Sequence, residues 1–150
     1  MKTIIKNTGI ILLVITASFF TACNHDSKNA EITEESINEL RSELKEVNSE
    51  IDRITADDIE DFNTAAYLVL EKFNQKIEDF EIRMNEKGQV IDQRTKNTIN
   101  QLKTTSNNLE TKLDQLEDKT EDHLVELKHE LKYDFAEFGK SVKNFFNDNK

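Results

Sequence analysis

Proline and tryptophan are absent from this 150-residue chain, cysteine occurs once and glycine occurs three times. A globular chain of this length ordinarily carries about ten glycines and about seven prolines, many of them in turns. So few turn residues exclude a β-sandwich, a β-barrel or a compact α/β enzyme, because each needs many tight connections. A single cysteine excludes an internal disulfide framework and a cysteine-rich metal cluster. The sequence therefore predicts an all-α fold.

Basic side chains are the minority, with 20 lysines and arginines against 30 aspartates and glutamates and a net charge of −10. Nucleic-acid binding needs lysine and arginine concentrated where the phosphates lie. The acidic balance therefore argues against a nucleic-acid partner. The length allows one domain.

The first residues have the organisation of a secretory leader. Lys2 and Lys6 supply a positive start, and an apolar stretch of 11 residues follows from Ile10 to Phe20. That stretch falls short of the ~20 apolar residues that span a bilayer as a helix. We expect residues 1–22 to be a signal peptide. The alternative is an uncleaved anchor that leaves Cys23 as an incidental thiol.

The leader ends in Phe20-Thr21-Ala22-Cys23. This segment resembles the lipobox of bacterial lipoproteins, which has a large apolar residue three places before an obligatory cysteine and small residues between them. Phe20 stands where that family usually has leucine. The resemblance implies cleavage before Cys23, diacylglyceryl attachment to its sulfur, and acylation of the new amino terminus, as with palmitate. Several acyl chains anchor a protein stably, whereas one chain binds only marginally.

Removal of the leader would take away two lysines, which leaves 18 basic against 30 acidic side chains and a net charge of −12. Residues 23–30 are polar after the cysteine and lack apolar periodicity, which predicts a short flexible tether. The lipobox thus implies a cell-envelope protein anchored in a membrane. The outer membrane is the expected one, with the body facing the periplasm or the cell surface.

From residue 31 onward, apolar residues recur at helical spacing. The first stripe is spaced 3-4-3-4-3 and consists of Ile37, Leu40, Leu44, Val47, Ile51 and Ile54. A second stripe consists of Phe62, Ala66, Val69, Phe73, Ile77, Phe80 and Met84. Charged and polar residues occupy most of the positions between. Such stripes are typical of coiled coils and helical bundles, in which the apolar face packs on another helix.

Two positions bear on where these helices end. Asp58 stands where the next apolar residue is due, and Thr55 with Asp58 matches a capping box that would start a new helix. The alternative is a helix that continues with a local shift. Gly88 follows Asn85-Glu86-Lys87, and glycine just past a helix that ends in lysine is the usual stop signal. We expect the main turn of the chain at Gly88.

The second run begins near Val90 and continues without a forced break. The weak helix formers at 104–108 predict its softest part. From Leu113 onward the spacing forms an eleven-residue repeat, which keeps the stripe nearly straight. The whole stripe consists of Ile99, Leu102, Leu109, Leu113, Leu116, Thr120, Leu124, Leu127, Leu131, Phe135, Phe138, Val142 and Phe145.

The two runs, 31–86 and 90–146, are almost equal in length, and each extends about 85 Å if fully helical. We predict a long antiparallel helical hairpin or coiled coil over residues 31–150 with its turn near 88. A break near Thr55 gives a three-helix bundle instead. A two-helix seam buries little apolar surface against a larger cost of ordering the chain. We therefore also predict self-association or a helical protein partner.

One segment has the spacing of a metal site. Glu126 and His129 form a Glu-x-x-His, the pair by which di-iron bundles bind metal from one helix. Those bundles need two such pairs and two further glutamates, whereas this chain has one pair and leucines at the inward positions. The sequence also lacks a glycine-rich phosphate loop and a nucleophile with its base. We predict no enzyme, no catalytic or cofactor-binding residue, and no metal or cofactor.

The last helical segment is rich in aromatic residues, namely Tyr133, Phe135, Phe138, Phe145 and Phe146. Core packing is the expected role. The alternative is an amphipathic helix that lies on lipid, as in apolipoproteins. Its charges are mixed, whereas helices that bind membrane surfaces prefer lysine and arginine.

Two broader resemblances concern the role of the chain. A lipobox cysteine, a heptad helix and a final Lys150 are together similar to a murein lipoprotein of the Braun type, which implies attachment to peptidoglycan through Lys150. This chain is much longer and turns at Gly88. Segments 113–119 and 130–140 resemble small coiled-coil stress-response proteins of Bacteroidota, which implies a stress-associated envelope role without site residues. We expect a non-enzymatic, membrane-anchored envelope lipoprotein with a structural or interaction role.

Overall fold

The computed structural model describes residues 32–117 and 121–149. Over these ranges the chain forms four α-helices and two short 3₁₀ turns, without a strand. In chain order they are α1 (Glu34–Glu50), η1 (Ile51–Arg53), η2 (Ala56–Asp58), α2 (Ile59–Glu86), α3 (Gln93–Glu117) and α4 (Glu121–Asp148). The predicted all-α class is confirmed, and the helices pack against one another as a bundle.

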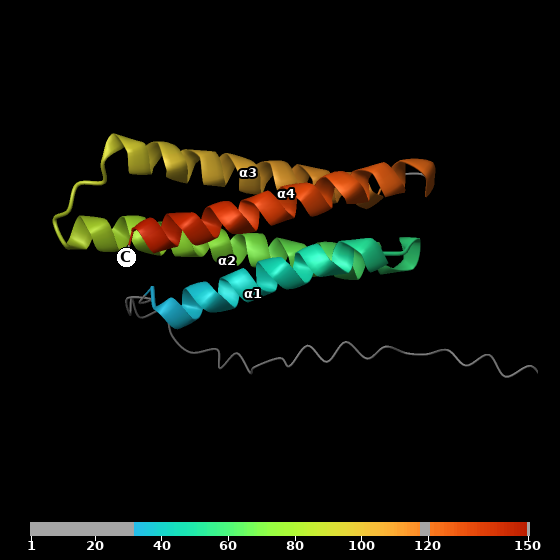
Figure 1. Cartoon of the computed structure of the whole chain (residues 1–150), viewed down its shortest axis with the longest axis horizontal. Coiled ribbons are helices and arrows are strands. Elements are labelled where there is room, and N and C mark those ends of the chain that lie inside the picture. The colour runs from blue at the N-terminus through green and yellow to red at the C-terminus, as the bar shows by residue number, and fades with distance from the viewer. Residues whose placement is uncertain (1–31, 118–120, 150) are drawn as a thin grey trace, which may run out of the picture.

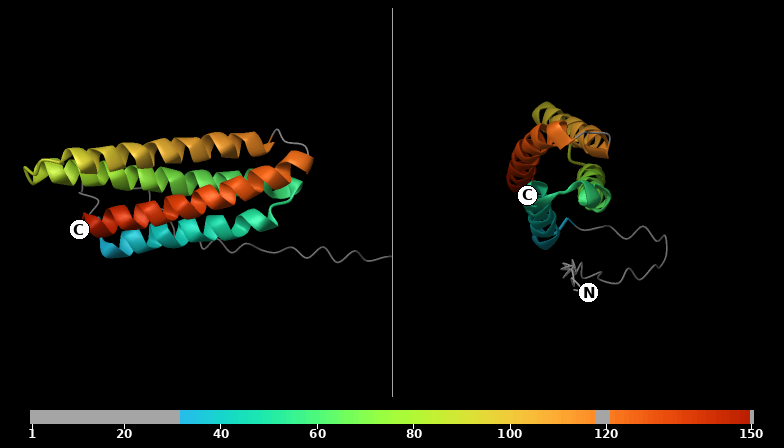
Figure 2. Two further views of the ribbon diagram at one scale, coloured as in Figure 1. Left: turned by 45° about the horizontal axis from the view of Figure 1, so that its top comes forward. Right: turned by 90° about the vertical axis from the view of Figure 1, so that its right-hand side faces the viewer.

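The helices run alternately up and down, so each lies antiparallel to its neighbours in the chain (Figure 1, Figure 2). α1 packs on α2, α2 on α3 and α3 on α4, and α4 returns to pack on α1, which closes the ring. One end of the bundle holds Ile32, the turn at Gly88 and Asn149, and we name it the Ile32 end. The opposite end holds η1, η2 and the start of α4, and we name it the Thr55 end.

Gly88 makes the turn between α2 and α3 where the sequence predicted it. Its φ is 63°, a left-handed conformation that glycine adopts without the steric penalty of a side chain. Gly88 N donates to Asn85 O at 3.0 Å, and Gln89 N donates to Met84 O at 2.9 Å. These bonds satisfy carbonyls that the end of α2 would otherwise leave unpaired.

The number of helices differs from the prediction, because both arms of the expected hairpin are divided. The first arm divides at Thr55, whose Oγ1 donates to Asp58 Oδ2 at 2.6 Å and whose backbone N donates to the same oxygen at 3.2 Å. Asp58 N also donates back to Thr55, which completes the capping box suggested by the sequence. This break was one of the two alternatives left open.

The second arm was expected to run unbroken over 90–146, and it instead forms α3 and α4. Between Leu116 and Leu124 the predicted stripe contains only Thr120, so no apolar side chain there favours a single long helix. Folding each arm back on itself lets each apolar stripe pack against two neighbouring helices. The body is therefore a four-helix bundle of up-down-up-down topology, where the sequence suggested two or three helices.

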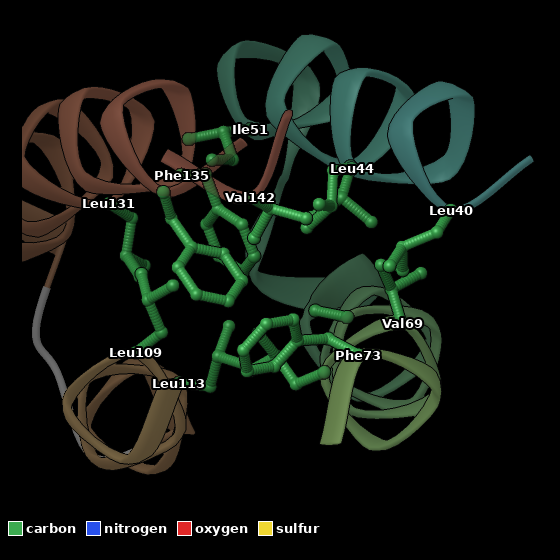
Figure 3. Close-up of a cluster of buried hydrophobic side chains, with 14 of the residues drawn as sticks. Leu40, Leu44, Ile51, Val69, Phe73, Leu109, Leu113, Leu131, Phe135 and Val142 are labelled. Carbon is green, nitrogen blue, oxygen red and sulfur yellow. The ribbon is translucent and has the colours of Figure 1, made fainter. Parts of the chain in front are cut away.

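The predicted stripes form the core. One continuous cluster of buried side chains runs through the described residues (Figure 3). It contains every described apolar residue of the predicted stripes except Met84, which is partly buried. Ile59, Leu70 and Phe146 are also buried, although they lie off the stripes. Their burial follows from ring closure, because each helix is covered on more than one side.

Aromatic contacts join α2 to α4 across the core. The ring centroids of Phe73 and Phe138 lie 4.8 Å apart at an interplanar angle of 76°, and those of Phe80 and Phe145 lie 5.2 Å apart at 74°. Phe145 also packs against Phe146, with centroids 5.1 Å apart. Edge-to-face pairs of this kind stabilise a fold by about 0.5–1.5 kcal/mol beyond the area they bury. The phenylalanines of α4 are therefore core residues in this structure.

α3 passes unbroken through residues 104–108, where the sequence predicted a soft spot. The hydroxyls of Thr104 and Thr105 donate to the carbonyls four residues earlier at 2.8 and 2.9 Å, so they are satisfied within the helix. Ser106 fills the gap in the predicted stripe and is fully buried. Its Oγ has no hydrogen-bond partner among the described residues.

Candidate functional site

Cys23, the predicted lipidation site, and Lys150, the candidate peptidoglycan attachment site, lie outside the described residues. The first described residue after Cys23 is Ile32, where the chain joins the bundle. A tether over residues 23–30 would lead into this end of the molecule. The Ile32 end is therefore the candidate functional region.

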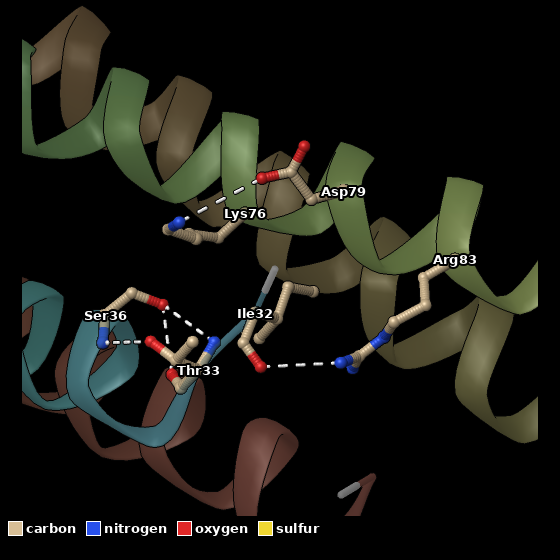
Figure 4. Close-up of polar contacts among 6 residues, drawn as sticks. All are labelled: Ile32, Thr33, Ser36, Lys76, Asp79 and Arg83. Carbon is tan, nitrogen blue, oxygen red and sulfur yellow. Dashed lines mark hydrogen bonds and ion pairs between the residues drawn. The ribbon is translucent and has the colours of Figure 1, made fainter. Parts of the chain in front are cut away.

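Thr33 and Ser36 fix the point at which the chain becomes helical (Figure 4). Ser36 N donates to Thr33 Oγ1 at 3.1 Å, and Thr33 N donates to Ser36 Oγ at 3.2 Å. These bonds satisfy backbone groups that the start of a helix leaves unpaired. Arg83 of α2 donates to the carbonyl of Ile32 at 3.4 Å, so the incoming chain is held against α2 as well.

A small pocket of about 180 Å³ lies at this end, between the start of α1, α2 and the end of α4. Ile37 and Phe146 contribute buried apolar surface to its lining. Arg41 and Arg83, both half-buried, contribute two guanidinium groups, and the exposed Glu34 contributes one carboxylate. The pocket thus places two cationic donors beside apolar surface.

The Thr55 end is held together by lysines of α4. Lys128 Nζ donates to the carbonyls of Asp52 and Ile54 at 3.1 and 2.9 Å, and Lys132 forms an ion pair with the Asp52 carboxylate. The hydrogen bond from Lys132 is the main reason that the pKa of Asp52 lies below its usual value. α4 therefore holds the segment that connects α1 to α2 through tertiary contacts.

A wider groove of about 580 Å³ lies between α3 and α4. Leu102 and Phe138, which are 3% and 1% exposed, contribute to its lining. The other lining side chains are uncharged hydroxyls and amides, apart from Glu137. Glu137 is the one titratable side chain among the residues that line this groove.

Polar contacts also specify which helices are neighbours. Asn63 of α2 is buried and donates to the carbonyl of Leu113 in α3 at 3.0 Å. Lys112 of α3 bonds to Asp134 at 2.7 Å and to Glu130 at 2.8 Å, both in α4. These hydrogen bonds, that of Asp134 first, raise the pKa of Lys112. These contacts join α2 to α3 and α3 to α4.

The Glu-x-x-His of the sequence faces solvent. Glu126 and His129 are exposed on α4, whereas Leu124, Leu127 and Leu131 point into the core and are buried. Across the residues that the structure describes, no three histidine, cysteine, aspartate or glutamate side chains gather in a metal-binding arrangement.

Comparison with family models, curated proteins and solved structures gave no match to this chain. The resemblances to bacterial lipoproteins and to coiled-coil stress-response proteins therefore stay predictions from the sequence. Within the described ranges, no helix is both long enough and apolar enough to cross a membrane.

The arginine and lysine side chains that form long-range contacts at the two ends of the bundle were not predicted from the sequence. Arg41 and Arg83 are 42 positions apart, and no spacing rule relates them. Lys128 is 74 positions from Ile54, whose carbonyl it binds. The available signal was compositional, because arginine occurs only four times in the chain.

Proposed function

We propose that this chain is a non-enzymatic lipoprotein of the cell envelope, anchored by lipid on Cys23, whose helical bundle has a structural or interaction role. The observation that carries the proposal is the segment Phe20-Thr21-Ala22-Cys23 after a positively charged start and a short apolar core. The first described helix, α1, begins at Glu34, and eight residues, 24–31, stand in the sequence between the proposed anchor and the first described residue, Ile32.

This proposal sets the orientation of the bundle. An anchor on Cys23 would hold the Ile32 end next to the membrane and direct the Thr55 end away from it. The acidic side chains of Asp52, Asp57, Asp58, Glu60 and Asp61, all exposed at the Thr55 end, would then point away from the bilayer. That arrangement keeps these acidic side chains away from negatively charged headgroups.

An interaction role is favoured over flat binding to lipid, because the apolar face of α4 is already covered. Phe135, Phe138, Val142, Phe145 and Phe146 are at most 4% exposed. A helix that lies on a bilayer offers such residues to the acyl chains, so the bundle would first have to open. Flotation of a leaderless chain, residues 23–150 with Cys23→Ser, on phosphatidylcholine liposomes without anionic lipid tests this. We expect no binding at low salt, and binding would favour the apolipoprotein-like alternative.

Self-association was predicted because a two-helix seam buries too little surface. The four-helix ring supplies further contacts within one chain, so a second chain is no longer needed for that reason.

Leu68 and Ile82 are 54% and 49% exposed and lie two heptads apart on α2. We propose this face for a helical partner or a second copy. Leu68→Glu with Ile82→Glu should abolish association in light scattering, whereas Val125→Glu, at an exposed apolar position of α4, should not.

Mass spectrometry of the membrane fraction tests the anchor directly. We expect a mature amino terminus at Cys23 that carries a diacylglyceryl group and an added acyl chain. Cys23→Ser should abolish both the modification and the cleavage. A mature chain that begins elsewhere, or an unmodified Cys23 in the membrane fraction, would contradict the proposal.

A further inference from the structure

Two of the four arginines in this acidic chain line the same pocket at the Ile32 end. The four are Arg41, Arg53, Arg83 and Arg94. Arg53 is ion-paired with Glu50 at 3.2 Å. In the described residues neither Arg41 nor Arg83 forms an ion pair with a carboxylate.

Both guanidinium groups keep donors for a ligand. Arg41 Nη1 donates to Asn38 Oδ1 at 3.1 Å, and Arg83 Nη1 donates to the Ile32 carbonyl at 3.4 Å. Both acceptors are neutral oxygens, and a guanidinium carries five N–H donors. The hydrogen bonds also limit the freedom of the two side chains. Arginine is the side chain best suited to bind a phosphate or carboxylate through two parallel hydrogen bonds.

The charge of the pocket is opposite to that of the chain. Its charged lining residues are Arg41, Arg83 and Glu34, which give a net charge of +1 against −10 for the whole sequence. Phe146 and Ile37 add apolar surface beside the two cations. An anionic group attached to an apolar or neutral body fits this lining better than a small free cation or a purely apolar ligand.

The position of the pocket indicates where such a group comes from. This step rests on the proposed lipid anchor at Cys23. The eight residues between Cys23 and Ile32 can extend at most about 30 Å from that anchor. The pocket therefore stays within reach of the headgroup layer. We propose that Arg41 and Arg83 bind the phosphate group of an anionic phospholipid, which docks the Ile32 end on the membrane surface.

Arginine modification of the full chain tests this. The protein is studied in phosphate-free maltoside micelles, in the same micelles with inorganic phosphate, and in vesicles of phosphatidylcholine with phosphatidylglycerol. Phenylglyoxal modification of each arginine is read by mass spectrometry. We expect phosphate and the vesicles each to slow modification of Arg41 and Arg83 several-fold. Arg94, at the same end but outside the pocket, and Arg53, at the Thr55 end, should react as before.

A substitution separates a shared site from two independent ones. Arg41→Gln should remove the protection of Arg83 in both conditions, and Arg94→Gln should leave it intact. Circular dichroism confirms that each variant keeps its helices. Absence of protection by phosphate and by vesicles overturns the site, and equal protection of Arg94 shows a general surface effect and overturns it too.

The two sources of phosphate give different results. If inorganic phosphate protects Arg41 and Arg83 and the vesicles do not, the two arginines still form a phosphate site. That result overturns the lipid as the source of the phosphate. The micelle measurements do not depend on acylation of Cys23, so they fail only if the pocket is wrongly assigned. The mass of the mature amino terminus tests the anchor alone.

Discussion

Gly88 and Gly139, the two glycines of the helical body, differ in the backbone conformation that a side chain would have to adopt. Gly88 has a φ of 63°, which an L-residue rarely adopts. Gly139 lies within α4, and a Cβ there would lie 3.8 Å from Leu44 Cβ, an ordinary contact. We expect Gly88→Ala to lower the free energy of unfolding by about 1 kcal/mol and Gly139→Ala to raise it by about the same amount.

Urea unfolding of the leaderless chain measures both changes. Gly88→Asn serves as the control, since asparagine tolerates the left-handed conformation better than alanine does, and it should cost less than Gly88→Ala. A stabilising Gly88→Ala or a destabilising Gly139→Ala would show that the local geometry differs from that described above.

Ser106 presents a second residue whose replacement should stabilise the fold. Its buried hydroxyl loses contact with water and finds no hydrogen-bond partner among the described residues. Desolvation of such a group costs about 1–3 kcal/mol, and alanine also has the higher helix propensity. We expect Ser106→Ala to raise the free energy of unfolding by about 1 kcal/mol. Thr104→Ala, at an exposed position of the same helix, should change it by less than about 0.5 kcal/mol.

The capping box formed by Thr55 and Asp58 ahead of α2 has a strength that depends on pH. The hydroxyl of Thr55, followed by its backbone N–H, lowers the pKa of Asp58 from the usual 3.8. A carboxyl whose pKa is lowered by folding contributes its full stabilisation at pH values above its usual pKa. That contribution is lost as the pH falls below about 3.8 toward the folded-state pKa.

We therefore expect Asp58→Asn to unfold at a lower temperature than the parent chain near neutral pH. The difference should shrink as the pH falls below 4, because protonation removes the same interaction from the parent. Thermal unfolding followed by circular dichroism across this range measures it. Asp57→Asn is the matched control, since Asp57 lies outside the capping box. A difference that stays constant with pH would mean that the charge of Asp58 has no part in the cap.

How far the elements follow from the sequence depends on whether a local signal marks their ends. Gly88 and the pair Thr55 and Asp58 carry such signals, and the chain turns or breaks at both places. The division between α3 and α4 carries none, because a polar residue within a stripe is common in long coiled coils. Local spacing predicted nearly every core residue, but it could not show that the arms fold back.

The residues missed by the sequence are those whose environment comes from distant helices. Leu70 and Phe146 are buried off the stripes because the ring covers them, and Ser106 is buried although it is polar. Arg41 and Arg83 meet only because α1 and α2 pack side by side. Of the candidate functional residues, Cys23 alone is indicated by a local motif.

At the scale of the whole molecule, one continuous core implies one unfolding transition. Phe73 is fully buried and contacts Phe138 on the opposite helix. We expect Phe73→Ala to lower the free energy of unfolding by about 3–5 kcal/mol while leaving its dependence on urea concentration unchanged. Helical circular dichroism and hydrogen exchange in α1 and α4 should report the same midpoint. Different unfolding midpoints for α1 and α4 would contradict a single cooperative unit.

Ile32 and Asn149 line one pocket, so the two ends of the described body lie side by side. A short linker between them would therefore join α4 to α1 without spanning the bundle. Opening the chain at the Gly88 turn would then give a circular permutant whose helices follow the order α3, α4, α1, α2. All four seams of the ring would be kept, because each joins helices that stay neighbours in space. The packing surfaces would thus accept at least one helix order besides the one in this chain.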